Sequence, residues 1–271
     1  MNDKRAGTTR VDTALVERGL ARSRRVAARL IAEGVVSEAG TQVLKPSQRV
    51  RDDQQLVVTA GDRYVSRAAH KLIAALDAFP VPTDGVLALD LGASTGGFSQ
   101  VLLERGAARV IAVDVGHGQL SSTLVGEPRL ISIEGFNVRY MTRASLTAAS
   151  GVDVCPTLVV GDLSFISLIT VLPAIRAVAP AGADVILLVK PQFEVGRTRV
   201  GEGVVHSPVL RADAVSSVVW AAWDLHLGTA GMCASPIVGT HGNQEYLVWL
   251  SADGGTDPTQ WRDRITTMVG A

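Results

Sequence analysis

The hydrophobic pattern near the N-terminus predicts two short amphipathic helices followed by short strands. Apolar residues recur three and four positions apart over 11–19 and 23–34, and Gly19 and Gly34 are natural helix ends. In the second helix the apolar residues share one face, and Ser23 is placed to cap the N-terminus. Short β-like segments, separated by turn residues, follow at 35–36, 41–43 and 56–59. We therefore expect a small, compact α+β unit.

Beyond residue 66 the pattern changes to alternating apolar strands and helices. Helical periodicity covers 71–78, 98–105 and 168–178. The predicted strands are 86–91, 109–114, 130–133, 157–162, 184–190, 232–238 and 245–250. Continuous apolar strands that alternate with helices are typical of a parallel sheet covered by helices on both faces. The sequence thus predicts a Rossmann-like α/β domain with a seven-stranded, mostly parallel sheet.

The two patterns meet at a short break in the sequence. Ala60, Gly61 and Asp62 interrupt the strand pattern and precede the first helix of the second region. We expect an N-terminal domain over 1–59, a linker over 60–66, and the larger domain over 67–271.

Composition excludes several classes of protein. The chain has 271 residues, of which 47% are apolar and 19% charged, so it can bury a core. Its two cysteines, Cys155 and Cys233, lie far apart, and no cysteine or histidine group has metal-ligand spacing. The N-terminus has no apolar stretch typical of a secretory signal, and every apolar run is shorter than the roughly 20 residues that span a bilayer. We expect a soluble, cytoplasmic protein that binds no metal and no membrane; its oligomeric state cannot be read from the sequence.

The formal net charge of zero hides an asymmetry along the chain. Residues 1–51 contain eleven Lys or Arg against five Asp or Glu, and the remainder contains 15 against 21. Local cations neutralise phosphates whatever the total charge of the chain. A phosphate-binding module joined to an acidic catalytic domain would have this distribution.

A glycine-rich turn follows the first strand of the larger domain, in the sequence VLALDLGASTGGF. Gly92, Gly96 and Gly97 would let the backbone approach a nucleotide-like ligand at a helix N-terminus. Ser94 stands where a dinucleotide fingerprint needs glycine, which argues against NAD. Asp114 closes the next strand, where an acid can accept hydrogen bonds from both hydroxyls of a cofactor ribose. A tight turn whose glycines bind nothing is the alternative. The candidate cofactor-binding residues are Asp90, Gly92, Ala93, Ser94, Thr95, Gly96, Gly97, Phe98 and Asp114.

Two further predicted strands end in ionisable residues. Asp162 follows LVVG, and Lys190 follows VILLV. The carboxyl ends of parallel strands share one edge of the sheet, and ligands of open α/β folds bind there. A charged residue after a buried strand is costly without a role, although one surface charge at a strand end is common. The two residues together indicate a site beside the glycine-rich turn.

Several sequence blocks resemble one known family. Residues 10–24 and 27–34 look like an S4 RNA-binding domain. The blocks SRAAHKL, LDLGASTGGF, DLSFISL, VKPQFE and GNQEYLVWL are similar to the TlyA family, whose members are also called haemolysin-like. That family joins an S4 domain to an FtsJ-type ribose 2′-O-methyltransferase domain with a class I methyltransferase fold. The resemblance covers nearly the whole chain in the same order.

The resemblance implies a function and a set of site residues. It implies S-adenosylmethionine as cofactor and cytidine 2′-oxygens of ribosomal RNA as substrate, in the small and possibly the large subunit. The catalytic tetrad of the family maps onto Lys71, Asp162, Lys190 and Glu245. The phosphate-contacting residues of S4 domains map onto Arg10, Arg22, Arg24 and Lys45. For any single arginine, a solvated helix face is an equally good interpretation.

The chemistry of such a tetrad follows from the groups involved. A ribose hydroxyl is a poor nucleophile, so the enzyme must position it and remove its proton. Lys190 is our candidate for steering the hydroxyl and, if neutral, accepting its proton, with Asp162 and Glu245 orienting the ammonium group. Lys71 would hold the substrate or complete the charge network, and which lysine is the base stays open. The alternative functions are a non-catalytic ribosome-assembly factor that binds RNA, and a cytolytic haemolysin.

Overall fold

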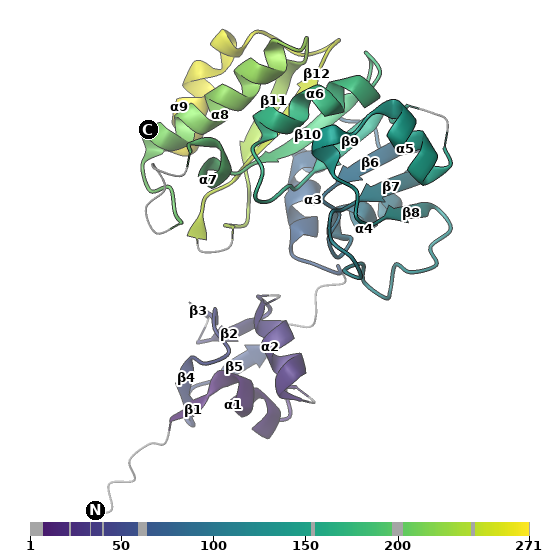
Figure 1. Ribbon diagram of the computed structural model, residues 1–271. Helices are drawn as coiled ribbons and strands as arrows, with labels where there is room; N and C mark the ends of the chain where they lie inside the picture. Colours follow the sequence, from purple (N-terminus) through teal and green to yellow (C-terminus); the bar gives the residue numbers. More distant parts are fainter. Residues whose placement is uncertain are drawn as a thin grey trace, which may run out of the picture. The chain divides into compact units, whose positions relative to one another are not determined.

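The computed structural model describes residues 8–21, 23–32, 34–39, 41–58, 64–152, 155–196, 203–239 and 242–270. Backbone contacts divide the chain into two compact units, Met1–Arg67 and Ala68–Ala271 (Figure 1). Each unit is described by itself. None of the helices in these ranges combines the length and the apolar character needed to cross a membrane.

The smaller unit consists of two helices packed on two small antiparallel sheets. The helices are α1 (Val11–Glu17) and α2 (Arg24–Ala32). One sheet pairs β1 (Thr8–Arg10) with β4 (Arg49–Arg51), and the other has the order β3-β2-β5. Those three strands are β3 (Thr41–Gln42), β2 (Val36–Glu38) and β5 (Leu56–Val58). The core is formed by Val11, Ala14, Leu15, Ala21, Ala27, Ile31, Val36, Val43, Val50 and Leu56.

The predicted helices of this unit are confirmed, each with a slightly earlier end. Gly19 and Gly34 both adopt positive φ, which ends the helical backbone because side-chain-bearing residues rarely adopt it. The hydrophobic pattern does not predict the β1–β4 pair, because each strand has three residues and mostly exposed side chains. Such a strand lacks the alternation that identifies longer ones.

The larger unit contains one seven-stranded sheet with the order β11-β12-β10-β9-β6-β7-β8. Strands β8, β7, β6, β9 and β10 run parallel, and β12 is antiparallel to both β10 and β11. The predicted fold class, a Rossmann-like sheet that is mostly parallel, is therefore confirmed. The strands are β6 (Leu87–Leu91), β7 (Arg109–Val113), β8 (Leu130–Ile133), β9 (Leu158–Gly161), β10 (Asp184–Val189), β11 (Gly228–Ala234) and β12 (Tyr246–Ser251).

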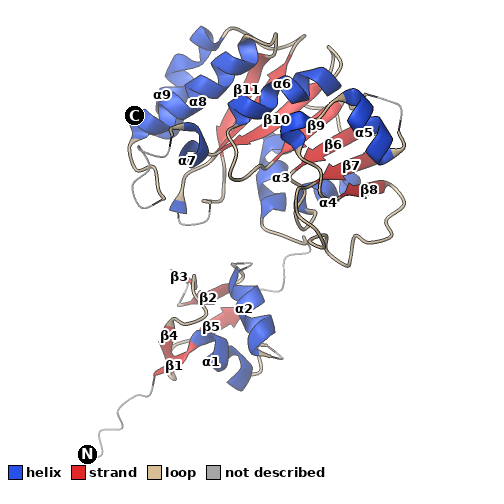
Figure 2. Cartoon of the chain, in the orientation of Figure 1, coloured by secondary structure: helices blue, strands red, loops and turns tan. Residues whose placement is uncertain are grey.

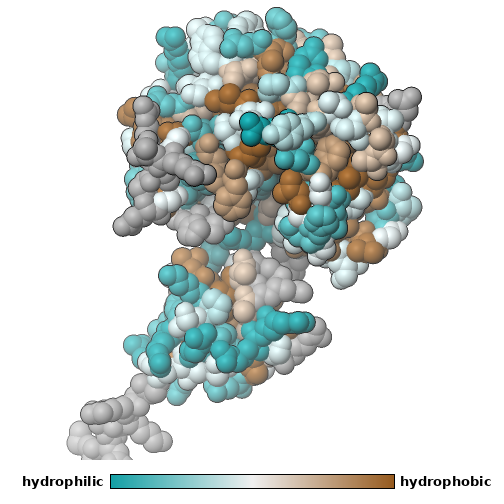
Figure 3. Space-filling view, in the orientation of Figure 1, coloured by the Kyte–Doolittle hydropathy of each residue, from teal (hydrophilic) through white to brown (hydrophobic). Residues whose placement is uncertain are grey.

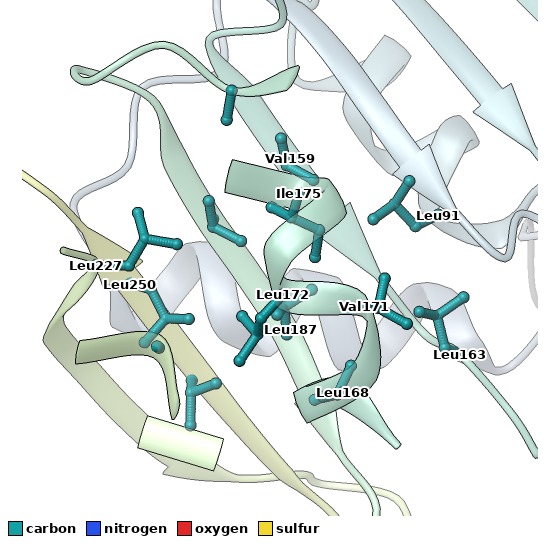
Figure 4. Packing of buried hydrophobic residues seen from close by; sticks show 14 of the residues in the cluster. Leu91, Val159, Leu163, Leu168, Val171, Leu172, Ile175, Leu187, Leu227 and Leu250 are labelled. Atoms are coloured by element: carbon teal, nitrogen blue, oxygen red, sulfur yellow. The ribbon is translucent and has the colours of Figure 1, made fainter. Parts of the chain in front are cut away.

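Helices cover both faces of this sheet, as Figure 2 shows with α6 and α8 in front and α3 and α4 behind. Alternate residues of a strand point to opposite faces, so Leu89 and Leu91 join the core under α6 while Asp90 faces α4. Figure 4 shows the α6 side, where Leu172 and Ile175 pack against the strands. The helices are α3 (Ala68–Ala78), α4 (Gly97–Glu104), α5 (Arg143–Ser150), α6 (Leu168–Val178), α7 (Pro191–Glu194), α8 (Pro208–Trp223), α9 (Arg262–Val269), and the 3-10 turns η1 (Val138–Tyr140) and η4 (Pro258–Trp261).

One predicted strand was misplaced. The prediction of 232–238 differs from the observed β11, which begins at Gly228 and ends at Ala234. The first half of β11 contains two glycines, and because glycine has a low strand propensity, the hydrophobic pattern does not predict a strand there. Both are required by packing: a Cβ at Gly228 would lie 2.5 Å from the backbone of Gly255, and a Cβ at Gly231 would lie 2.8 Å from the Phe79 ring.

Candidate active site

Four ionisable side chains meet at the carboxyl edge of the parallel strands. Asp162 directly follows β9, Lys190 directly follows β10, and Lys71 reaches the same place from α3. Glu245 comes just before β12, which runs antiparallel to β10 with Tyr246 opposite Val189. The antiparallel strand therefore begins at the edge where the parallel strands end, and this brings Glu245 to the same edge, where it contacts Lys71.

The four groups form a continuous chain of ion pairs. Lys71 Nζ lies 2.7 Å from Glu245 Oε2 and 3.2 Å from Asp162 Oδ2. Lys190 Nζ lies 2.6 Å from Asp162 Oδ1. Asp162 thus bridges the two lysines with one oxygen each. Two cations and two anions balance within the cluster, which is how buried charges are tolerated.

Burial and charge act in opposite directions on Asp162. Burial raises the pKa of this carboxyl group, but the ammonium groups of Lys190 and Lys71 outweigh that effect and hold the pKa below its ordinary value. Asp162 is therefore ionised at neutral pH and keeps both lysines in place.

The loop after Asp162 adds two residues that the sequence had shown only as part of the block DLSFISL. Lys190 Nζ donates a hydrogen bond of 2.8 Å to Ser164 Oγ. Phe165 adopts a φ of +65° and is 92% exposed, with its ring 5.5 Å from that of Phe193. A large apolar side chain in a strained, exposed conformation beside an ion-pair cluster is unusual for a folded protein. Neither feature is visible in a one-dimensional pattern.

The glycine-rich turn lies directly beside the ion-pair cluster. Gly92 has a φ of +79°, and a Cβ there would lie 3.0 Å from the Leu163 side chain and 3.1 Å from the backbone oxygen of Asp162. A side chain at Gly92 would therefore displace Asp162. Gly96, with a φ of +93°, precedes α4 as its N-cap, and no side chain caps this helix end. Close approach and a positive φ explain why both positions are glycine.

Asp90 is a buried acid beneath this turn. Ser99 Oγ donates a 2.6 Å hydrogen bond to Asp90 Oδ2, whereas Asp90 Oδ1 is buried without a hydrogen-bond partner among the described residues. Burial raises the pKa of Asp90 to about 7, the Ser99 hydroxyl partly opposes this, and the charge of Asp162 adds to it. An unsatisfied buried acceptor is costly and indicates a place for a donor.

Asp114 is engaged with the turn backbone. Its Oδ2 accepts a hydrogen bond from Ser94 N at 2.8 Å, and its Oδ1 accepts one from Gly116 N at 2.7 Å. Each carboxylate oxygen has a second lone pair, so these bonds leave acceptor capacity. The expected role at a ribose stays a prediction, but the structure adds a role in holding Ser94, whose φ is +49°.

The segment after Asp114 lies over the glycine-rich turn. Gln119 Oε1 accepts a 3.1 Å hydrogen bond from Ser94 Oγ, and Ser121 N donates one of 3.1 Å to Thr95 O. A Cβ at Gly96 would collide with the Leu124 side chain. The remaining predicted cofactor residues Ala93, Gly97 and Phe98 are buried in the turn and the first turn of α4. All nine candidates therefore lie in or beside one turn.

The predicted phosphate-binding residues of the smaller unit have different surroundings. Arg10 and Arg24 both form ion pairs with Asp12, at 3.0 Å and 2.9 Å, and both stay largely exposed. Lys45 is exposed, and Arg22 lies outside the described residues. The described surface of this unit is mainly hydrophilic in the view of Figure 3. In the parts of the chain that the structure describes, no group of three or more His, Cys, Asp or Glu could hold a metal ion.

Comparison with known families identifies two matches. An FtsJ-like methyltransferase domain matches residues 64–252, and an S4 domain matches residues 9–56. The chain is similar to the 16S/23S rRNA (cytidine-2′-O)-methyltransferase TlyA of Mycobacterium tuberculosis, with 51% identity over 90% of each chain. It is also similar to the 23S rRNA (cytidine-2′-O)-methyltransferase TlyA of Campylobacter jejuni, with 34% identity over 77% of this chain and 79% of the relative.

A solved structure shares the architecture. It is the structure of a protein from Streptococcus thermophilus that is named as a hemolysin. Its sequence is 35% identical, the match covers 97% of this chain and 94% of the other, and the TM-score is 0.75. Relatives that carry a hemolysin name and relatives that carry a methyltransferase name therefore match the same chain.

Proposed function

The chain belongs to the TlyA family of rRNA methyltransferases, and on that premise we propose that it transfers the methyl group of S-adenosylmethionine to a cytidine 2′-oxygen of ribosomal RNA. The observation that carries the proposal is the position of the ion-pair cluster directly beside the glycine-rich turn. A methyl donor in that turn and a hydroxyl at the cluster would be neighbours.

The residues present fit this cofactor. Asp90 Oδ1 is a buried acceptor without a partner among the described residues, and no side chain in that part of the chain caps the N-terminus of α4. An amino-acid ligand that carries an ammonium group and a carboxylate would satisfy an unpaired acceptor and a helix N-terminus together. Asp114 is placed to accept hydrogen bonds from ribose hydroxyls, and Gly92, Ala93, Ser94, Thr95, Gly96, Gly97 and Phe98 would form the surrounding turn.

When bound, S-adenosylmethionine supplies a sulfonium methyl group that is already a strong electrophile. The protein must therefore position the 2′-hydroxyl in line with that methyl group and take up the hydroxyl proton. We assign both tasks to Lys190, which can accept the hydroxyl proton only after its own ammonium group has released one to solvent, because its two partners differ from those of Lys71. Lys71 lies between two carboxylates, whereas Lys190 has one carboxylate and the neutral, exposed Ser164 hydroxyl. A substrate hydroxyl could replace that of Ser164.

The other three members of the tetrad hold Lys190 in place. Asp162 fixes its ammonium group from one side, and Lys71 with Glu245 fixes Asp162 from the other. Phe165 offers an exposed aromatic face beside the site, on which a base could stack. In this proposal the residues act as one unit, so the loss of any member should impair transfer.

We propose that residues 1–59 form the RNA-binding domain, 60–66 the linker and 67–271 the catalytic domain. Arg10, Arg22, Arg24 and Lys45 would contact RNA phosphates. The relative with the higher identity is named for 16S and 23S rRNA, so we propose both ribosomal subunits as substrates. A cytoplasmic location follows from that substrate.

Incubation of the purified protein with tritium-labelled S-adenosylmethionine and unmodified 30S or 50S subunits tests the proposal. We expect label in RNA, at 2′-O-methylcytidine by mass spectrometry, with wild-type protein and none with Lys190→Ala. Binding to subunits without transfer would instead identify an assembly factor. Leakage of dye-loaded liposomes without transfer would identify a cytolysin.

A further inference from the structure

The smaller unit contains a carboxylate that joins two of the predicted RNA-binding arginines. Arg10 Nε and Nη2 each lie 3.0 Å from an oxygen of Asp12, and Arg24 Nη2 lies 2.9 Å from the same oxygen that accepts from Arg10 Nη2. Because two bonds end on one oxygen atom, the two guanidinium groups lie side by side. The arginines come from β1 and α2, so only the fold brings them together.

Burial distinguishes the acid from the arginines. The side chain of Asp12 is 5% exposed, whereas those of Arg10 and Arg24 are 45% and 60% exposed. The guanidinium of Arg10 holds the pKa of Asp12 well below its usual range, with a further contribution from Arg24, so the bridge persists at any physiological pH. Each guanidinium has five N–H donors and uses at most two on Asp12. Donors therefore remain for a ligand in solvent.

The described contacts of Asp12 argue against a purely structural role. Besides the two arginines, its carboxylate accepts only a long 3.4 Å bond from the neighbouring Thr13 hydroxyl. Arg18 provides a contrast in the same unit. It donates hydrogen bonds to the backbone oxygens of Gln54 and Arg51, which ties α1 to the β4–β5 region. Asp12 orders two side chains that face solvent, whereas Arg18 binds backbone oxygens within the unit.

We propose that Asp12 is a positioning residue for RNA binding, which fixes Arg10 and Arg24 as a preformed pair that clamps one phosphate of the RNA backbone. Two adjacent guanidinium groups match the two non-bridging oxygens of a phosphodiester. Ordering the two long side chains before binding lowers the entropy lost on complex formation. The inference rests on the proposed role of these arginines in RNA binding.

The proposal makes a prediction opposite to that of simple electrostatics. Asp12→Asn removes a negative charge near RNA and should tighten binding if net charge alone matters. Positioning predicts instead that the full-length variant binds 30S and 50S subunits about tenfold more weakly, since two side chains lose their order. The matched control is Asp53→Asn, which removes an equal charge from an exposed pair with Arg51 in the same unit. We expect this control to bind as well as the wild type or slightly better.

Two further measurements distinguish a positioning role of Asp12 from a structural role, and from the case in which these arginines do not contact RNA. In an Arg10→Ala/Arg24→Ala background, Asp12→Asn should cause no further loss; an added loss would indicate a structural role and overturn the proposal. Unchanged or tighter binding by Asp12→Asn, with weaker binding by the double variant, would overturn positioning alone. Normal binding and an unchanged salt dependence of the double variant would show that Arg10 and Arg24 do not contact RNA, and would contradict their proposed role.

If Asp12→Asn does not fold, a measurement on the wild-type protein still tests the proposal. Nitrogen-15 spectra of the arginine side chains report rotation about the Nε–Cζ bond. Positioning predicts hindered rotation for Arg10 and Arg24 in the free protein, compared with rapid rotation for the exposed Arg25. Rotation as fast as that of Arg25 would overturn the proposal.

Discussion

Asp12 and Asp162 each bridge two cations, but the exposure of the bridged cations differs between the two units. The arginines at Asp12 are 45% and 60% exposed, whereas the lysines at Asp162 are 11% and 8% exposed. Arginine stays protonated in proteins and presents its donors in a fixed planar fork. An exposed pair of permanent cations suits binding to phosphates. In the proposed function, the buried, ion-paired lysines instead position a substrate hydroxyl.

The largest expected effect is at Lys190. Lys190→Ala should lower the rate of methyl transfer at least about a thousandfold, because general base catalysis and alignment are lost together. The affinity for S-adenosylmethionine should change little, since the cofactor residues lie in the glycine-rich turn. Labelled-methyl transfer and calorimetry measure the two quantities separately.

Lys190→Arg sharpens the same test. It keeps the charge beside Asp162 but cannot give up its proton at working pH. Activity as low as that of Lys190→Ala would support proton transfer by this residue. Near-normal activity would contradict it and leave orientation as the role of Lys190.

The two bridging acids should differ in their effect on stability. Asp162→Asn leaves two buried lysines with one carboxylate and should destabilise the larger unit by about 3–5 kcal/mol. Asp12→Asn leaves arginines that reach solvent, so its cost should be about 1 kcal/mol or less. Urea denaturation of the variants measures both. Equal costs would show that burial does not distinguish the two bridges.

Asp90 provides a pH test within the larger unit. Its pKa of about 7 lies above that of the unfolded chain, so the folded state binds the proton more tightly. The contribution to stability is therefore present at low pH and is lost as pH rises from about 4 toward 7. Between pH 5 and pH 8, wild-type protein should lose stability relative to Asp90→Asn, by a few kcal/mol at most. A pH-independent difference in unfolding free energy would contradict the raised pKa.

The smallest expected effect is at Phe165. Its positive φ disfavours any residue with a Cβ, so Phe165→Gly should be more stable than Phe165→Ala by about 1 kcal/mol. Both variants should bind rRNA more weakly and bind cofactor normally, because both lose the exposed ring. Thermal unfolding and a KM for ribosomal subunits check the two statements. A normal KM in both variants would mean that the ring does not contact RNA.

Much of the architecture was predictable because local physics specifies it. The apolar strands β6, β7, β8, β9 and β10 are continuous hydrophobic runs, and each was found within one residue at either end. The weak strand β11 was misplaced because Gly228 and Gly231 are dictated by distant backbone and ring contacts. The β1–β4 pair was missed because three-residue strands carry too little periodicity.

By itself, the sequence determined the element types and the division into a basic and an acidic part, and its resemblance to the TlyA family predicted the four tetrad residues. Only the tertiary structure decided which charges meet, since Lys71 and Glu245 are 174 positions apart and form a 2.7 Å contact. It also decided that Asp12 joins Arg10 and Arg24, and that Ser164 is the second partner of Lys190. Periodicity reports which face of an element is buried, whereas the pairing of charges depends on how strands are ordered and in which direction they run.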